Sequence, residues 1–254
     1  MPTSTISTRH GQMAYLSIGH GRPFVLLHGN TMTAASQEKL ARRFIDEYRV
    51  VCVDLLGHGR SARPLHLFSR DYFRLQGEAV ADLLTGLFAN EQVIVFGMSA
   101  GGVAALNAAC HCQDRIAALV IDSSFSYIGV ETLIAHREGM EYLSPSWEHY
   151  LRNQHGHDWW PQLKTGLLDT IGQLAETMDS VTPCLAAIRA PTLIFQGGQD
   201  PFSHESQGRE MAMTIPNAKL IYDPEAGHIL SWRDPGRFRN TVREFLHEQL
   251  VLWS

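Results

Sequence analysis

The chain has 254 residues, 44% of them hydrophobic and 19% charged, so it can bury a substantial core within a single domain. Its formal net charge of −5 argues against a nucleic-acid partner, which would require a basic patch to neutralise phosphates. The polar segment 1–11 lacks the apolar core of a secretory signal, and no apolar run is long enough to span a bilayer. We therefore expect a cytoplasmic protein without membrane insertion.

Short apolar runs recur along the chain, and helical patterns separate most of them. The first run, 13–18, is predicted to form a hairpin with the next; the later runs are 24–28, 50–54, 92–96, 117–121, 192–195 and 218–221. Strands that alternate with helices favour a mostly parallel sheet covered on both faces. The predicted fold class is α/β, with a central sheet flanked by helices.

A long stretch between the runs at 117–121 and 192–195 breaks this alternation and is rich in aromatic residues. We interpret 124–188 as a helical cap inserted into a single domain, 1–254. An insertion there would cover the carboxyl ends of the strands, where open α/β sheets bind ligands. Tyr127, Trp147 and Trp159 are the aromatic residues that we predict to line the pocket.

Cysteine and histidine usage indicates neither a disulfide framework nor a metal site. Cys52, Cys110, Cys112 and Cys184 lie in apolar or helical stretches of a chain too long to need stapling, so reduced thiols are expected. The cap contains several histidines and carboxylates without the spacing of a metal-ligand set. They are interpreted as a solvated helical face, comprising His136, His149, His155, His157, Glu138, Glu141, Glu148 and Asp158.

The strongest chemical signal is Gly97-Met98-Ser99-Ala100-Gly101, which lies between the run at 92–96 and an Ala-rich helical pattern at 100–109. In a nucleophile elbow, a serine occupies a strained turn from strand to helix, and its neighbours two residues away must be small. Ser99 is therefore the predicted nucleophile.

A serine hydroxyl needs a base to remove its proton, and the base needs a carboxylate to orient it. His228 follows the last predicted strand by a short loop and is the predicted base. Asp200 follows the strand at 192–195 and is the predicted orienting carboxylate, which gives the chain order Ser, Asp, His. Asp122, at the end of the strand after the nucleophile helix, remains an alternative to Asp200.

A tetrahedral oxyanion requires two N–H donors that are already in place. The backbone N–H of Ala100 is expected to supply one, because this residue directly follows the nucleophile. The backbone N–H of Asn30 is expected to supply the other, since Gly29 permits a sharp turn after the strand at 24–28. His28 is expected to brace this loop.

These motifs together resemble the α/β-hydrolase superfamily along almost the whole chain: His28-Gly29-Asn30, the glycine-containing loop 54–61, the elbow, Gly198-Gln199-Asp200 and Gly227-His228. Segments 97–102, 155–160 and 190–192 look like the biphenyl-hydrolase-like and valacyclovir-hydrolase-like group. Hydrolases of that group that act on aminoacyl esters are expected to carry Asp directly after the nucleophile. This chain has Ala100 there, so the resemblance does not extend to amino-acid esters.

The sequence thus predicts a serine hydrolase that cleaves a small carboxylic ester through an acyl-enzyme on Ser99, without a cofactor or metal. Its expected partner is a small acyl substrate, and its oligomeric state is left open. The same three residues could also support thioester, lactone or carbon–carbon bond hydrolysis, or perhydrolysis. A small-ligand receptor that turns over slowly or not at all is the alternative from another class.

Overall fold

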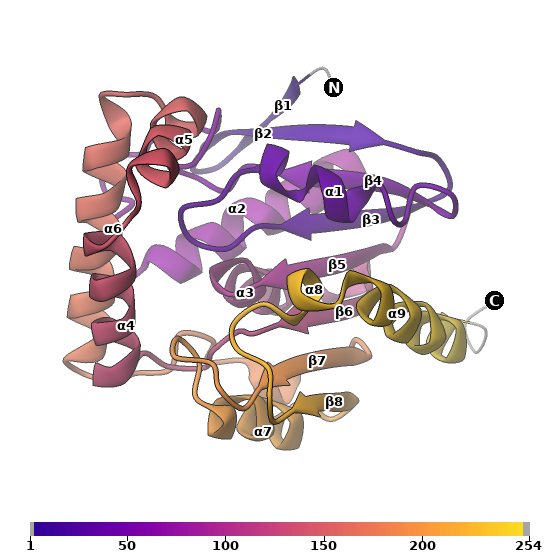
Figure 1. Cartoon of the computed structure of the whole chain (residues 1–254). Helices are drawn as coiled ribbons and strands as arrows, with labels where there is room; N and C mark the ends of the chain where they lie inside the picture. The colour runs from indigo at the N-terminus through magenta and orange to yellow at the C-terminus, as the bar shows by residue number, and fades with distance from the viewer. Residues whose placement is uncertain (1–2, 251–254) are drawn as a thin grey trace.

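An eight-stranded sheet runs through the computed structural model, which describes residues 3–250 (Figure 1). The strand order is β1-β2-β4-β3-β5-β6-β7-β8, and the strands from β4 to β8 in this order are parallel. The strands are β1 (Thr3–Thr8), β2 (Gly11–Ile18), β3 (Arg22–Leu27), β4 (Tyr48–Val53), β5 (Val93–Met98), β6 (Ile116–Asp122), β7 (Thr192–Gly197) and β8 (Ala218–Asp223). The predicted mostly parallel sheet is confirmed.

The predicted pairing at the amino terminus is wrong. β2 pairs antiparallel with β1 on one side and with β4 on the other, so it forms no hairpin with β3. β3 instead lies between β4 and β5 in the interior of the sheet. The edge strand β1 was missed because its sequence, TSTIST, is polar and has no fully buried position, as the edge of a sheet permits.

Alternate side chains of the central strands enter two hydrophobic clusters, one on each face of the sheet. In β3, Val25 and Leu27 join the cluster that includes α2 and α3, whereas Phe24 and Leu26 join the cluster that includes α9. This division follows from the two-residue period of a strand. The helices of the two layers are α1 (Glu38–Ala41), α2 (Tyr72–Leu87), α3 (Ala100–Cys112), α7 (Glu205–Thr214), α8 (Leu230–Arg233) and α9 (Pro235–Leu250), with 3-10 turns η1 (Ala34–Gln37), η2 (Gln113–Arg115) and η3 (Leu185–Ala187).

Three helices lie between β6 and β7: α4 (Val130–Glu141), α5 (Pro145–His155) and α6 (Trp159–Ala175). They lie beyond the carboxyl ends of the parallel strands (Figure 1). The start of α5 follows from its sequence, because Ser144 accepts a hydrogen bond from the Trp147 N–H at 3.3 Å and Pro145 occupies the first turn. In the part of the chain that the structure describes, no helix is long and apolar enough to cross a membrane.

The prediction that all four cysteines are reduced is wrong for two of them. Cys110, in the last turn of α3, forms a disulfide with Cys184, just before η3; their Cα atoms are 5.9 Å apart. Cys52 and Cys112 are free thiols. The two bonded residues are separated by 74 positions in the chain, so no local pattern indicated that the fold would bring them together.

Candidate active site

Ser99 lies at the junction between β5 and α3 and has a strained backbone. Its φ of 51° and ψ of −123° fall outside the regions that non-glycine residues favour. The backbone is held on both sides, since the Ser99 N–H donates to the Asp122 carbonyl at 2.8 Å and the Gly102 N–H donates to the Ser99 carbonyl at 2.9 Å. The turn therefore presents the Ser99 side chain at the carboxyl edge of the sheet.

The glycines two residues to either side of Ser99 are required by packing. A Cβ on Gly97 would lie 2.3 Å from the Gly101 carbonyl oxygen, and one on Gly101 would lie 2.4 Å from the Leu27 carbonyl oxygen. Neither contact is possible without moving backbone. A Cβ on Gly29 would lie 3.2 Å from the Ser99 Cβ, which shows how closely the loop after β3 approaches the serine.

The structure brings His228 and Asp200 together from the loops that follow β8 and β7. The His228 Nδ1–H donates to Asp200 Oδ2 at 2.7 Å. The other carboxylate oxygen, Oδ1, accepts from the N–H groups of Phe202 at 2.8 Å and Ser203 at 3.1 Å. The Asp200 side chain is fully buried and the His228 side chain is 19% exposed. The carboxylate thus fixes the imidazole, and its Nε2 has no hydrogen-bond partner within residues 3–250.

Asp122, the alternative carboxylate, hydrogen-bonds elsewhere. Its Oδ1 accepts from the Leu230 N–H at 3.1 Å and its Oδ2 from the Ser231 N–H at 2.9 Å. It therefore holds the start of α8, directly after the loop that carries His228. Burial raises the pKa of the Asp122 carboxyl, and these N–H donors oppose the shift.

The predicted oxyanion donors lie near the same edge. Ala100 is the first residue of α3, where a helix leaves its N–H without an intrahelical acceptor. Within residues 3–250, neither Ala100 nor Asn30 donates a backbone hydrogen bond. His28 braces the loop after β3, which carries Asn30: its Nδ1–H donates to the Gly29 carbonyl at 2.8 Å, and its Nε2 accepts from the Leu55 N–H at 3.0 Å.

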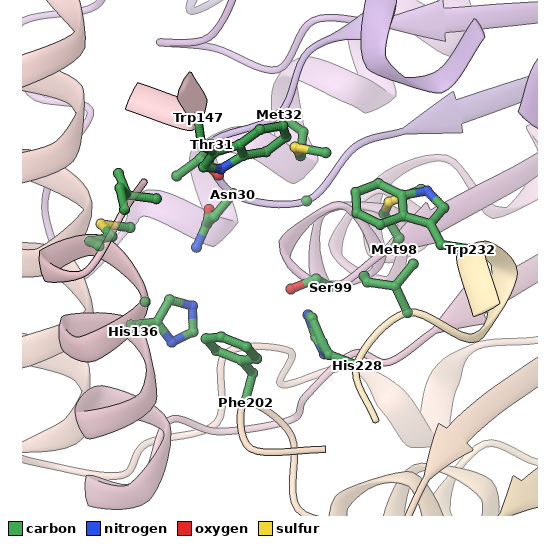
Figure 2. Close-up of a pocket in the computed structure, with 15 residues that line it drawn as sticks. Asn30, Thr31, Met32, Met98, Ser99, His136, Trp147, Phe202, His228 and Trp232 are labelled. Atoms are coloured by element: carbon green, nitrogen blue, oxygen red, sulfur yellow. The ribbon is translucent and has the colours of Figure 1, made fainter. Parts of the chain in front are cut away.

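A cavity of about 210 Å³ opens in front of Ser99 and His228, between the sheet edge and α4 (Figure 2). This volume lies below the roughly 300–1,000 Å³ of sites for drug-sized ligands, so the cavity fits a small molecule. Its lining is mainly apolar and comprises Gly29, Asn30, Thr31, Met32, Met98, Ser99, His136, Gly139, Met140, Leu143, Trp147, Phe202, His228, Ile229 and Trp232.

Of the aromatic residues predicted to line the pocket, Trp147 lies at this cavity but Tyr127 and Trp159 do not. Tyr127 forms a β-bridge with Ser180 away from the site. Trp159 faces the loop 54–61, where its Nε1–H donates to the Gly57 carbonyl at 2.7 Å, and Arg63 lies over its ring. Trp159 thereby attaches α6 to the loop 54–61, whereas Tyr127 joins two positions that flank α4, α5 and α6.

Several lining residues were not anticipated, although local signals for them exist. Met98, Phe202 and Trp232 lie within four positions of Ser99, Asp200 and His228 respectively, so the turns that present those residues also present these side chains. His136 belongs to a buried stripe on α4 at helical spacing, with Thr132 before it and Met140 after it.

The interpretation of the cap histidines as a solvated face is wrong for His136 and His155, which are 5% and 1% exposed. His155, at the end of α5, contacts the loops that follow β4 and β3: its Nδ1 accepts from the Gly59 N–H at 3.0 Å and its Nε2–H donates to the Thr31 carbonyl at 2.8 Å. The inserted segment thereby supports the loop that carries Asn30. No group of His, Cys, Asp or Glu in residues 3–250 is arranged to hold a metal ion.

Acidification is expected to destabilise the protein through these imidazoles. Burial lowers the pKa of His28, His136 and His155 to about 4 in each case. Below the ordinary histidine pKa of about 6.5, the unfolded chain binds protons that the folded chain does not. The contribution of these imidazoles to the free energy of unfolding is therefore fully present above that pH and is lost as the pH falls toward 4. Between pH 7 and pH 5, each imidazole is expected to lower the free energy of unfolding by about 2 kcal/mol.

Urea unfolding at the two pH values, with His136→Phe as the comparison, measures one such contribution. Asp54 and Asp122 act in the opposite direction because burial raises their pKa values, so the wild type alone reports only a sum. The His136→Phe variant is expected to lose about 2 kcal/mol less than the wild type on acidification. If acidification lowered the free energy of unfolding by the same amount in both proteins, His136 would not be held neutral in the folded state.

Comparisons with known proteins extend over most of the chain. The model of the alpha/beta hydrolase family matches residues 24–241. Serine hydrolase BPHL of Mus musculus is 26% identical over 244 residues, which cover 91% of this chain and 82% of that protein. The pimeloyl-(acyl-carrier protein) methyl ester esterase of Chromobacterium violaceum is 26% identical over 259 residues, with 92% and 97% covered.

A solved structure shows the same fold. The esterase from Exiguobacterium antarcticum aligns with a TM-score of 0.76 over 97% of this chain and all of that chain, at 19% identity. Identity at that level establishes the likeness of fold alone. Within the matched family, it is the geometry at the sheet edge that bears on the chemistry.

Proposed function

Because the chain belongs to the alpha/beta hydrolase family, we propose that this hydrolase cleaves a small carboxylic ester through an acyl-enzyme on Ser99. The observation that carries the proposal is the hydrogen bond from His228 Nδ1 to the buried Asp200 carboxylate, with the same imidazole facing the cavity that Ser99 lines. Two relatives whose similarity covers most of this chain are named as a serine hydrolase and an esterase.

The reaction begins as Ser99 Oγ attacks the ester carbonyl and its proton passes to His228 Nε2. Asp200 stabilises the imidazolium and keeps Nδ1 protonated, so that Nε2 is the nitrogen that accepts. The imidazolium then protonates the departing alkoxide, and the alcohol leaves an acyl group on Ser99. A water molecule, deprotonated by His228, attacks this acyl group; the bond to Ser99 Oγ breaks, His228 returns the proton to that oxygen, and the carboxylic acid leaves.

Negative charge on the tetrahedral oxygen needs donors that do not reorganise. The backbone N–H groups of Ala100 and Asn30 serve this purpose in the proposed mechanism. Both meet the requirement of being unpaired within the described chain, and the start of α3 adds the positive end of a helix dipole. His28 and His155 hold the carbonyls of Gly29 and Thr31, on either side of Asn30.

The inserted helices α4, α5 and α6 act as a cap in this proposal. Trp147 and Met140 from this segment line the same cavity as Ser99. An apolar cover of this kind excludes water and favours a substrate with a short hydrocarbon part. A cytoplasmic location stays a prediction. The Cys110–Cys184 bond argues against it, because disulfides persist mainly in oxidising compartments.

Covalent labelling tests the proposal directly. The folded protein is treated with a fluorophosphonate, its intact mass and peptide map are recorded, and p-nitrophenyl esters of increasing acyl length are assayed on the same sample. One label per chain on Ser99 is expected, together with turnover that favours short acyl groups. Tight binding of an ester without labelling or product would overturn the proposal in favour of a small-ligand receptor.

A further inference from the structure

His136 lies across the cavity from Ser99, on the inward stripe of α4 (Figure 2). Its position is fixed on two sides. The Nδ1–H donates to the Thr132 carbonyl one turn earlier at 2.8 Å, and the ring meets the Phe202 ring edge to face with centroids 4.9 Å apart. The mechanism proposed above uses His228 as its only proton carrier and has no task for this second imidazole.

The hydrogen bond to Thr132 determines what His136 offers the cavity. A carbonyl oxygen can only accept, so Nδ1 carries the proton and Nε2 of the neutral ring presents a lone pair. Within residues 3–250, no group donates a hydrogen bond to this nitrogen. Burial favours the neutral ring, since it lowers the pKa of His136 to about 4. The ring is therefore an acceptor and not a cation.

Asn30 provides a second polar group at the same cavity. Both its amide oxygen and its amide nitrogen are buried and have no hydrogen-bond partner among residues 3–250. In Figure 2 the side chain points into the space between His136 and Ser99. Buried amides rarely stay unpaired, because an unmet hydrogen bond in an apolar site costs free energy.

The remaining walls exclude charged substrates. Among the described residues, the lining contains no lysine, arginine, aspartate or glutamate, and its other members are mostly Met, Leu, Ile, Phe and Trp. A substrate carboxylate would meet no cation there, and a substrate ammonium would meet no anion. Burying either charge unpaired is costly. The polar part of the substrate must then be neutral and must carry a proton to donate to His136.

We propose that His136 is a specificity-determining residue that selects uncharged esters bearing a hydroxyl group near the scissile carbonyl. The hydroxyl donates to His136 Nε2 and can accept from the Asn30 amide nitrogen, so one group pairs two of the three unpaired polar atoms. This inference rests on the proposed esterase function and adds the class of substrate.

Matched ester pairs that differ by hydroxyl against methyl provide the test. On the acyl side, each enantiomer of methyl 3-hydroxybutyrate is compared with methyl 3-methylbutyrate; on the alcohol side, 2-hydroxyethyl butyrate is compared with propyl butyrate. The ratio of kcat/KM within a pair cancels effects common to both esters. The wild type is expected to favour the hydroxyl ester of one pair by about tenfold, the value of one neutral hydrogen bond.

Three variants assign that preference to a residue. His136→Phe keeps an aromatic ring against Phe202 and removes the acceptor, so the ratio is expected to fall by about tenfold. His136→Gln retains an acceptor and is expected to restore part of the preference. His157→Phe makes the same exchange at an exposed histidine between α5 and α6, and its ratio should match the wild type.

The outcomes separate this inference from the function beneath it. If the wild type hydrolyses the methyl-bearing esters and is labelled on Ser99 but favours neither hydroxyl ester, this inference fails and the esterase function stands. A preference that survives His136→Phe also overturns it. If no ester is hydrolysed and Ser99 is not labelled, the proposed function itself fails. Should His136→Phe not fold, the wild-type preference and the Gln variant decide the question.

Discussion

Replacing Ser99 with alanine is expected to lower kcat by about 10⁴-fold or more, because the remaining site can bind and polarise an ester but cannot form the acyl-enzyme. The fold should survive. No hydrogen bond within residues 3–250 is made by the Ser99 hydroxyl, so its removal leaves no buried partner unpaired. The alanine methyl group fits the space that the serine Cβ already occupies beside Gly29.

Two measurements on the same preparation check this expectation. Steady-state hydrolysis of p-nitrophenyl butyrate gives kcat, and thermal unfolding shows whether the variant is folded. Ser17→Ala on β2 is a matched control, since Ser17 is exposed and does not belong to the described cavity lining. A folded Ser99→Ala protein that retained most of its turnover would remove Ser99 from the role of nucleophile.

Asp200→Asn and Asp122→Asn are expected to have different effects: the first mainly lowers kcat and the second mainly lowers stability. Asn at 200 can still accept a hydrogen bond, but its NH₂ group favours the wrong imidazole tautomer and cannot stabilise an imidazolium. We expect kcat to fall by about 10⁴-fold. Asn at 122 disturbs the N–H groups of Leu230 and Ser231 instead, which should cost about 1–3 kcal/mol of stability and less than about tenfold in kcat.

Kinetics and urea unfolding of the two variants distinguish these effects. The pair is matched, because both substitutions exchange a buried carboxylate for an amide of nearly equal size. The expected pattern is a large kcat loss with modest destabilisation for Asp200→Asn, and the reverse for Asp122→Asn. If the Asp122 variant instead lost catalysis while the Asp200 variant remained active, Asp122 would be the carboxylate that orients the base.

Local sequence patterns anticipated the elements that position the site. Buried strands appear as short apolar runs. The turn from strand to helix at Ser99 is recognisable in the sequence because only glycine fits two residues to either side of the serine. Asp200 and His228 each follow a predicted strand by a short loop. Because the carboxyl ends of parallel strands meet at one edge, the order of the motifs along the chain was enough to bring them to the same place.

The pairings between distant segments were not accessible in this way. The polar strand β1 has no periodic signal, the place of β2 beside β4 depends on the strand order, and the Cys110–Cys184 contact joins positions 74 residues apart. The choice between Asp122 and Asp200 was also open. Both follow strands at the same edge, and only the tertiary structure shows which carboxylate the His228 ring meets.

By itself, the sequence determined the α/β class, the elbow at Ser99 and the loops that carry Asp200 and His228, because period, glycine spacing and chain order are local properties. The tertiary structure decided which residues of α4, α5 and α6 line the cavity beside Ser99. Trp147 lies at the cavity and Tyr127 and Trp159 do not, while His136 lies opposite Ser99. The rotation of a helix about its axis depends on everything that packs against it, so the identity of its inward side chains emerges only when the whole core is assembled.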